Sequence, residues 1–235
     1  MTLSTVIDDA LAQLNVKMPA AIAAQSTDKT ARLLLALANR EARHQVAEHD
    51  WQALIVQNSF AALAQAAQTG ALPTGFARLV NNTHIWNSTQ RTRYAGPTTS
   101  NRWQADTISG ATSVYGTWRI INGVLNLNPV PTAGDLITFE SIDSRFANLA
   151  GGGTGARFVS GDDEYRLDEL LLELGIIWRF GAGTKGFDYS EAMADWTRHR
   201  DTVASQDKGT PGIVVPQSSG QSGMPFLNWD GVIVE

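Results

Sequence analysis

The chain has no cysteine and few charged residues, and both features narrow what the protein can be. With no cysteine among 235 residues, it forms no disulfide and holds no metal through thiolates, as expected of a protein made in a reducing cytoplasm. Charged residues make up 17% of the sequence, below the roughly one quarter that is usual. No apolar run approaches the ~18 residues of a membrane span, and the N-terminus lacks the basic and hydrophobic segments of a signal peptide. We therefore expect a folded protein that does not cross a membrane.

The remaining composition suits a globular protein that does not coat nucleic acid. Hydrophobic residues account for 43% of the sequence, enough for a buried core in one or two domains. The net charge is −5 and the pI is near 5.4, whereas general nucleic-acid binding requires a cationic surface. An acidic surface past which DNA slides remains compatible with these values.

The sequence contains no motif of an active site. Residues 181–186 read G-A-G-T-K-G and match the letters of a dinucleotide fingerprint, but they follow a predicted helix where that fingerprint requires a strand. The glycine cluster at 148–154 has no lysine to bind a phosphate, so we interpret it as a flexible loop. His44 and His49 are five residues apart, which does not fit a helical zinc motif, and Asp162, Asp163 and Glu164 have no further metal ligand nearby. The prediction is a protein without catalytic, cofactor-binding or metal-binding residues.

Two helices are expected within residues 160–206. Apolar residues recur at helical spacing in the first of them, at Leu167, Leu170, Leu171, Leu174 and Trp178. Leu172 and Ile176 lie off this stripe, which predicts that the helix is covered on more than one side. The second helix begins at Asp188, with Glu191 completing a capping box, and we expect it to bury Tyr189, Ala192, Met193 and Trp196.

Two further helices are predicted at the N-terminus. The first has an apolar stripe of Leu3, Val6, Ile7, Ala10 and Leu14, with a capping signal from Thr5 to Asp8. Residues 26–28 open the second helix, whose buried side is Leu34, Leu37, Ala38, Ala42 and Val46. Its solvent-exposed side is expected to hold Asn39, Arg40, Arg43 and Glu48. Trp51, just after it, is interpreted as a core aromatic.

The middle third changes to β-periodicity. Strands are expected over 77–86 and over 136–142, with a short helix at 98–105. A strand is also expected near 54–63, although the alanine- and glutamine-rich stretch to Gln68 leaves a helix possible there. The strongest local signal is Asn122-Gly123 between residues 116–121 and 124–128, which predicts a two-residue hairpin. We expect an antiparallel sheet of at least four strands.

The C-terminal segment is polar in its middle and apolar at its ends. Residues 217–223 are rich in serine, glycine and glutamine and cannot form a core, whereas 213–215 and 226–234 are apolar. This pattern predicts an extended arm that docks on another subunit or on its own domain.

These elements predict an α+β fold, in which N- and C-terminal helices form a helical bundle with an inserted antiparallel β-sheet and an extended C-terminal arm. The expected units are the N-terminal helices of the bundle (1–51), the sheet insertion (52–158), the C-terminal helix pair of the bundle (159–206) and the arm (207–235).

The layout resembles a known family. The order of elements, the N-R-E-A-R-H-Q-V-A-E-H-D-W-Q run at 39–52, the L-P-T-G-F step at 72–76 and the final helix pair are similar to the head-to-tail adaptors of short-tailed bacteriophages, the tail tubular protein A-like group. This resemblance covers residues 1–206 and rests on layout and diffuse patterns rather than on a sharp motif.

The resemblance implies a structural virion protein that is not an enzyme. Such a protein forms a homo-oligomeric ring, commonly of twelve copies, beneath the portal protein, continues the DNA channel and attaches tail components. Its location would be the head–tail interface of the virion, with transient contact to genomic DNA and none to a membrane. One alternative is a receptor- or glycan-binding module that uses Trp86, Trp103, Tyr115 and Trp118. Another is a hydrolase, for which no G-x-S-x-G elbow or H-E-x-x-H helix is present.

Overall fold

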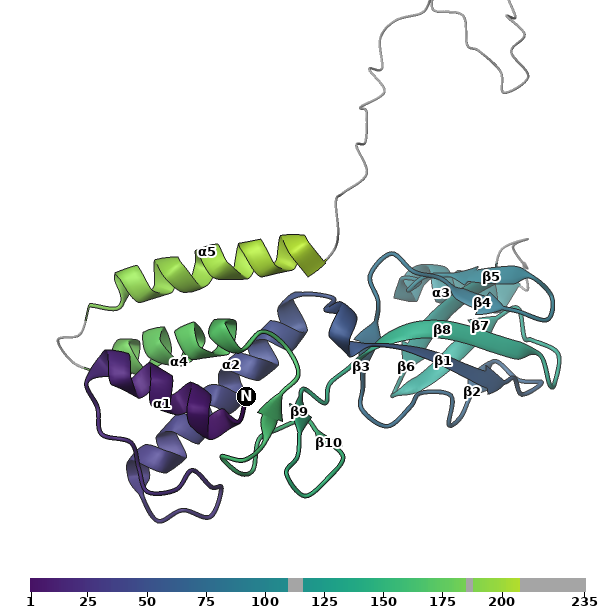
Figure 1. Cartoon of the computed structure of the whole chain (residues 1–235). Helices are drawn as coiled ribbons and strands as arrows, with labels where there is room; N and C mark the ends of the chain where they lie inside the picture. Colours follow the sequence, from purple (N-terminus) through teal and green to yellow (C-terminus); the bar gives the residue numbers. More distant parts are fainter. Residues whose placement is uncertain (110–115, 185–187, 208–235) are drawn as a thin grey trace, which may run out of the picture.

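The helices and the main sheet form two neighbouring parts of the molecule (Figure 1). The computed structural model describes residues 1–109, 116–184 and 188–207. The helical layer consists of α1 (Leu3–Leu14), α2 (Lys29–Glu48), α4 (Glu169–Gly183) and α5 (Ser190–Asp207). In it, α4 packs against α1, α2 and α5. The predicted arm, apart from Asp207, lies outside the described residues.

Local capping chemistry sets the ends of these helices. The side chain of Asp28 accepts a hydrogen bond from the backbone N–H of Thr30 and caps α2, as residues 26–28 predict. Thr2 caps α1 instead of the expected Thr5, and Asn15 ends this helix in the left-handed conformation at φ 52°. Asp168, whose carboxylate accepts from the N–H of Leu171, caps α4.

The predicted buried faces of α4 and α5 are partly wrong. Leu170 is 46% exposed, so an aspartate at this position is not expected to unfold the protein. The buried residues of α4 are Leu171, Leu172, Gly175, Ile176 and Ile177, and three of them, Leu171, Leu172 and Ile176, were predicted to be covered. Leu174 and Trp178 of the predicted stripe are only partly buried against the same core. On α5, Trp196 is buried as expected, but Tyr189 and Met193 are 40% and 44% exposed. The helix period alone does not say which of two apolar stripes meets the core.

The main sheet has eight strands and curls into a half-barrel. Its strands are β1 (Ile55–Ala61), β2 (Ala67–Gln68), β3 (Phe76–Leu79), β4 (Ile85–Asn87), β5 (Thr92–Ala95), β6 (Gly116–Ile121), β7 (Val124–Asn128) and β8 (Leu136–Asp143). The strand order is β1-β8-β4-β5-β6-β7-β2, and β3 also pairs with β8. The expected strand at 77–86 is in fact two strands, β3 and β4, separated by a turn with Asn82 at φ 61°.

The predicted fold class is therefore wrong. The described residues contain five helices and a large mixed sheet, not a helical bundle with a small inserted antiparallel sheet. The sheet is mixed because β5 and β6 pair in parallel, Tyr94 opposite Gly116. Parallel neighbours need a crossover connection, and α3 (Ser100–Ser109) lies in the connection between these two strands. The short helix was expected, but its crossover role depends on which strands pair.

The Asn122-Gly123 turn is confirmed. Asn122 and Gly123 have φ of 49° and 73°, both positive as a type I′ turn requires, and Ile121 pairs with Val124 in the β6–β7 hairpin.

Replacing Gly123 by valine should lower the free energy of unfolding by about 1–3 kcal/mol, because a β-branched residue strains at positive φ. A Cβ at Gly123 would meet no atom within 4 Å, so the effect is conformational and not steric. Gly123→Asn is the matched control, since asparagine tolerates this conformation and should retain most of the stability. Urea denaturation of both variants measures the difference; equal losses would contradict the turn assignment.

A small sheet and charged contacts join the two parts. β9 (Ala147–Asn148) lies between β10 (Thr154–Gly155) and β11 (Glu164–Tyr165). From β3, Arg78 donates to the backbone carbonyls of Val46 and His49 at the end of α2. At the end of β8, burial opposes ionisation of Asp143, but hydrogen bonds and positive charge from Arg145, followed by the charge of Arg166, outweigh it and lower the pKa of Asp143 below its ordinary value.

Each part has its own apolar core. One cluster joins the helices to Phe146, Phe158 and Tyr165 of the small sheet and its connections. A second lies within the half-barrel around Ile85, Leu125 and Ile137.

Candidate functional site

A buried polar cluster on α2 holds the helical layer together. Glu41 is fully buried, and its carboxylate accepts hydrogen bonds from Arg179 Nε at 2.5 Å, Trp196 Nε1 at 2.8 Å and Gln45 Nε2 at 2.9 Å. These donors come from α4, α5 and α2 itself, so one carboxylate links three helices. Gly175 on α4 leaves room for the Glu41 side chain, since a Cβ at position 175 would lie 2.4 Å from Glu41 Cγ.

The cluster continues to the small sheet through Tyr165. Its hydroxyl donates to Oε1 of Gln45 at 2.7 Å. Burial, and then the negative charge of Glu41, raises the pKa of Tyr165 well above its ordinary value. Tyr165 therefore stays a neutral hydrogen-bond donor, which fixes β11 against α2.

Asn39 fixes a second segment beside α2. Its side-chain amide accepts from the backbone N–H of Phe158 at 2.7 Å and donates to the carbonyl of the same residue at 3.1 Å. The prediction that Asn39 lies on the solvent-exposed side of the helix is wrong, because Asn39 is only 6% exposed. A buried asparagine needs such partners, and this contact brings residues 156–158 next to α2.

The first candidate surface, which we call the basic face, consists of Arg32, Arg40 and Arg43 on the outward side of α2 and Arg157 on the neighbouring segment after β10. All four residues are exposed. None forms an ion pair within the part of the chain that the structure describes; Arg43 donates instead to the carbonyl of Asn39.

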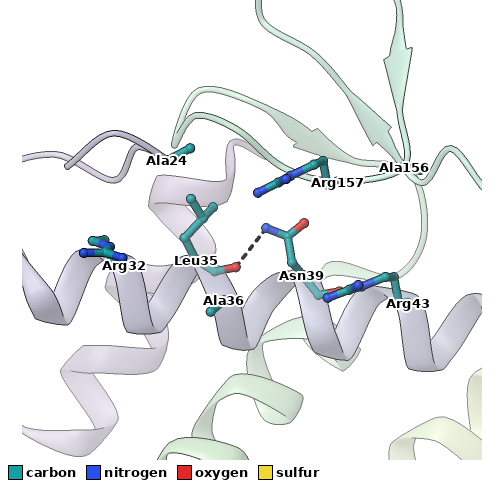
Figure 2. A pocket seen from close by; sticks show the side chains of 8 residues that line it. All are labelled: Ala24, Arg32, Leu35, Ala36, Asn39, Arg43, Ala156 and Arg157. Atoms are coloured by element: carbon teal, nitrogen blue, oxygen red, sulfur yellow. Dashed lines mark hydrogen bonds between the residues drawn. The ribbon is translucent and has the colours of Figure 1, made fainter.

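A pocket of about 390 Å³ lies within the basic face. Figure 2 shows Arg157 extending over the pocket from the segment above α2, while Arg32 and Arg43 lie along the helix and Leu35 and Asn39 line it between them. Among its lining residues there is no carboxylate. Guanidinium groups without a carboxylate partner are suited to bind carboxylates or phosphates, often through two parallel hydrogen bonds.

Next to the basic face, a groove runs between α2, α4 and α5. Its aromatic walls are Trp178 and Trp196, with ring centroids 6.0 Å apart. The guanidinium of Arg179 lies 4.3 Å from the Trp178 ring and that of Arg200 lies 5.2 Å from the Trp196 ring, both within cation–π range. Leu33, 48% exposed, lines the neighbouring pocket with Arg40 and Trp178. This edge of the helical layer thus combines positive charge with apolar area.

A second surface, the acidic face, consists of Asp8 and Asp9 on α1, Glu173 on α4, and Glu164 on β11, which pairs with Thr2 just before α1. Partial burial, and then the nearby charge of Asp9, raises the pKa of Glu173. In the described ranges no lysine, arginine or histidine pairs with any of the four carboxylates. The exposed Leu170 lies one helical turn before Glu173, so this face too includes an apolar residue.

The residues that the sequence singled out do not converge on one site. His44 is exposed and pairs with Glu48 at 3.5 Å, whereas His49 contacts Asp207. Asp163 is buried and accepts three backbone N–H groups, so its role is structural. Across the residues described, no group of three or more His, Cys, Asp or Glu side chains could hold a metal ion.

The glycine motif and the aromatic residues are also dispersed. Gly181 and Gly183 belong to the last turn of α4, with Thr184 as its C-cap, and the rest of the motif falls partly outside the described residues. Trp103 and Trp118 are buried, Trp86 is 47% exposed, and Tyr115 lies outside the described residues.

The basic face was missed although its signal was present. Arg32, Arg40 and Arg43 follow one another at intervals of eight and three residues, which places them on one side of a helix. The contribution of Arg157 could not be found this way, because it depends on the contact between Asn39 and Phe158.

Comparison with known proteins gives no assignment: no protein-family model matches the chain, and the search of curated proteins finds no match either. None of the helices in the described ranges has both the length and the apolar character needed to cross a membrane.

Proposed function

We propose that this protein is a structural virion component, a head-to-tail adaptor of a short-tailed bacteriophage. It forms a ring beneath the portal protein, continues the DNA channel and attaches tail components. The resemblance over residues 1–206 in the order of elements and in the runs at 39–52 and 72–76 supports this proposal, and the net charge of −5 suits a channel that lets DNA pass without holding it.

The observation that carries the proposal is the pair of charged faces on the helical layer. A ring built from identical subunits requires each copy to present two different, complementary surfaces. The basic face and the acidic face differ in sign, and each has an exposed leucine beside it, Leu33 and Leu170 respectively.

Binding to portal-bearing phage heads tests the proposal. The purified protein is mixed with heads of the same phage that carry the portal but lack the adaptor, and the particles are imaged by cryo-electron microscopy. We expect a ring of added density directly beneath the portal. Heads that carry a portal but acquire no density at saturating protein would overturn the adaptor function.

Removal of residues 208–235 should weaken docking without unfolding the subunit. Asp207 is the last residue of α5 and accepts a hydrogen bond from the backbone N–H of Gln52, so a chain ending there keeps the described core contacts. We expect the melting temperature to change little, while the fraction of heads that bind the protein falls. Calorimetry and electron microscopy follow the two properties; a large loss of thermal stability with unchanged docking would place the arm in the subunit's own core.

A glycan-binding virion module is the second candidate, favoured by Trp86 on β4. Its ring is half exposed at a shallow pocket that is also lined by Gln57, His84 and Glu140. An exposed aromatic ring with polar neighbours is an arrangement suited to amphipathic ligands.

Under this alternative, Trp86→Ala should reduce binding on a glycan array at least about tenfold, because a single aromatic anchor often supplies 2 kcal/mol or more. Leu136→Ala is the matched control, since Leu136 is 45% exposed on the same sheet but does not line this pocket. Absence of wild-type binding to any glycan would exclude the alternative.

A further inference from the structure

We infer that the basic face of one copy of this chain binds the acidic face of the next copy. The inference rests on the ring proposed above and names the surfaces that build it. The contact would place Arg32, Arg40, Arg43 and Arg157 opposite Asp8, Asp9, Glu164 and Glu173.

The two faces point in different directions from one shared core. On α4, Glu173 lies beside α1, where Gln13 donates to its carboxylate, and Arg179 lies beside α2, bound to Glu41. Glu173 and Arg179 are six residues apart, and at about 100° per residue their side chains leave α4 about 120° apart. Figure 1 shows α1 in front of α2, whereas in Figure 2 the pocket side of α2 faces the viewer with α1 behind it.

Neither face can neutralise the other within the same subunit. The helices that carry them are fixed by one apolar core, which includes Leu11 of α1, Leu34 of α2 and Ile176 of α4. The charges therefore stay on separate surfaces of a rigid layer. A neighbouring copy of the chain carries four carboxylates that can face the four arginines, and four arginines that can face the four carboxylates.

The chemistry of the two faces fits a protein–protein contact. Arginine pairs with carboxylates through planar, two-point hydrogen bonding, and arginine is enriched in interfaces relative to lysine. Leu33 beside the basic face and Leu170 beside the acidic face provide apolar area that is removed from water when the faces meet. Complementary charge sets the orientation and the association rate of such a contact.

Binding of a nucleic acid would explain the basic face but not the acidic face. Its phosphates would engage the basic face but would be repelled by the net charge of −5 and by the carboxylates of the acidic face. The two-faced pattern is accounted for by a heterologous contact, in which different surfaces of identical subunits meet and the chain of contacts closes into a ring.

Charge reversal tests the inference with the full chain. One variant carries Arg40→Glu and Arg43→Glu, the second carries Asp8→Lys and Asp9→Lys, and a third carries all four substitutions. All four side chains are exposed, and thermal melting verifies that each variant folds. Arg102→Glu with Arg119→Glu is the control, since it changes the net charge as much as the first variant but lies on α3 and β6.

Sedimentation equilibrium at low and high salt measures self-association. We expect the wild-type chain to associate more weakly at high salt, each two-residue variant to lose at least about tenfold in affinity, and the control to behave as wild type. The four-residue variant, and an equal mixture of the two defective variants, should regain association because opposite charges face each other again.

Several results would overturn the inference. These are a wild-type chain that stays monomeric at low salt, face variants that associate as the wild type does, or a mixture that does not recover. Loss of binding to a DNA duplex in the arginine variant with unchanged self-association would assign the basic face to nucleic acid instead. Binding to portal-bearing heads separates the two proposals. If the chain self-associates through charge but does not dock on the portal, this inference stands and the adaptor function is overturned. If both face variants still dock on the portal, the adaptor function stands and this inference is overturned.

Discussion

Replacing Glu41 by alanine is expected to lower the free energy of unfolding by about 3–5 kcal/mol, because breaking a buried ion pair leaves its partner uncompensated. The Arg179 guanidinium and the Trp196 indole N–H both lose their acceptor, and the new cavity cannot be filled without moving α4 or α5. Loss of this carboxylate should therefore loosen all three helices and the groove between them.

Urea denaturation measures the effect, with Glu48→Ala as the control on the same helix. Glu48 pairs with Arg200 at 2.8 Å, but its side chain is 36% exposed, and exposed pairs contribute about 0–1 kcal/mol. If the two variants lost equal stability, the buried cluster would not be what joins α2, α4 and α5.

Asp163→Ala should cost about 3 kcal/mol, since it leaves three part-buried backbone donors without the carboxylate that accepts from them. The carboxylate accepts from the N–H groups of Ala150 at 3.0 Å, Val159 at 2.7 Å and Ser160 at 2.9 Å. These bonds hold together the segment that carries Arg157. We therefore expect faster amide hydrogen exchange at residues 150, 159 and 160, together with lower global stability.

Asp162→Ala is the matched control for this prediction. Asp162 is the exposed neighbour, and among the residues that the structure describes its carboxylate has one hydrogen-bond partner, the Ser160 hydroxyl at 3.4 Å. It should leave stability and exchange rates nearly unchanged. Equal exchange rates in the two variants would show that Asp163 does not order the segment.

The candidate surface could be anticipated from the sequence only in part. The spacing of Arg32, Arg40 and Arg43 places them on one side of a helix, and α2 begins after Asp28 as its capping signal predicts. The inward positions of Asn39 and Glu41 could not be found, because a polar residue is buried only where distant partners satisfy it. Those partners, Phe158, Arg179 and Trp196, are more than a hundred residues away.

By itself the sequence determined those features whose physics is local: the helix cap at Asp28, the short helix that carries Trp103, and the type I′ turn at Asn122-Gly123. Each depends on the φ angles or hydrogen bonds of neighbouring residues. Only the tertiary structure decided that β5 and β6 pair in parallel, that the sheet is mixed, and that Leu170 faces outward. Strand pairing and the choice between two apolar stripes are set by long-range contacts, for which a period of two or 3.6 residues offers equally good alternatives.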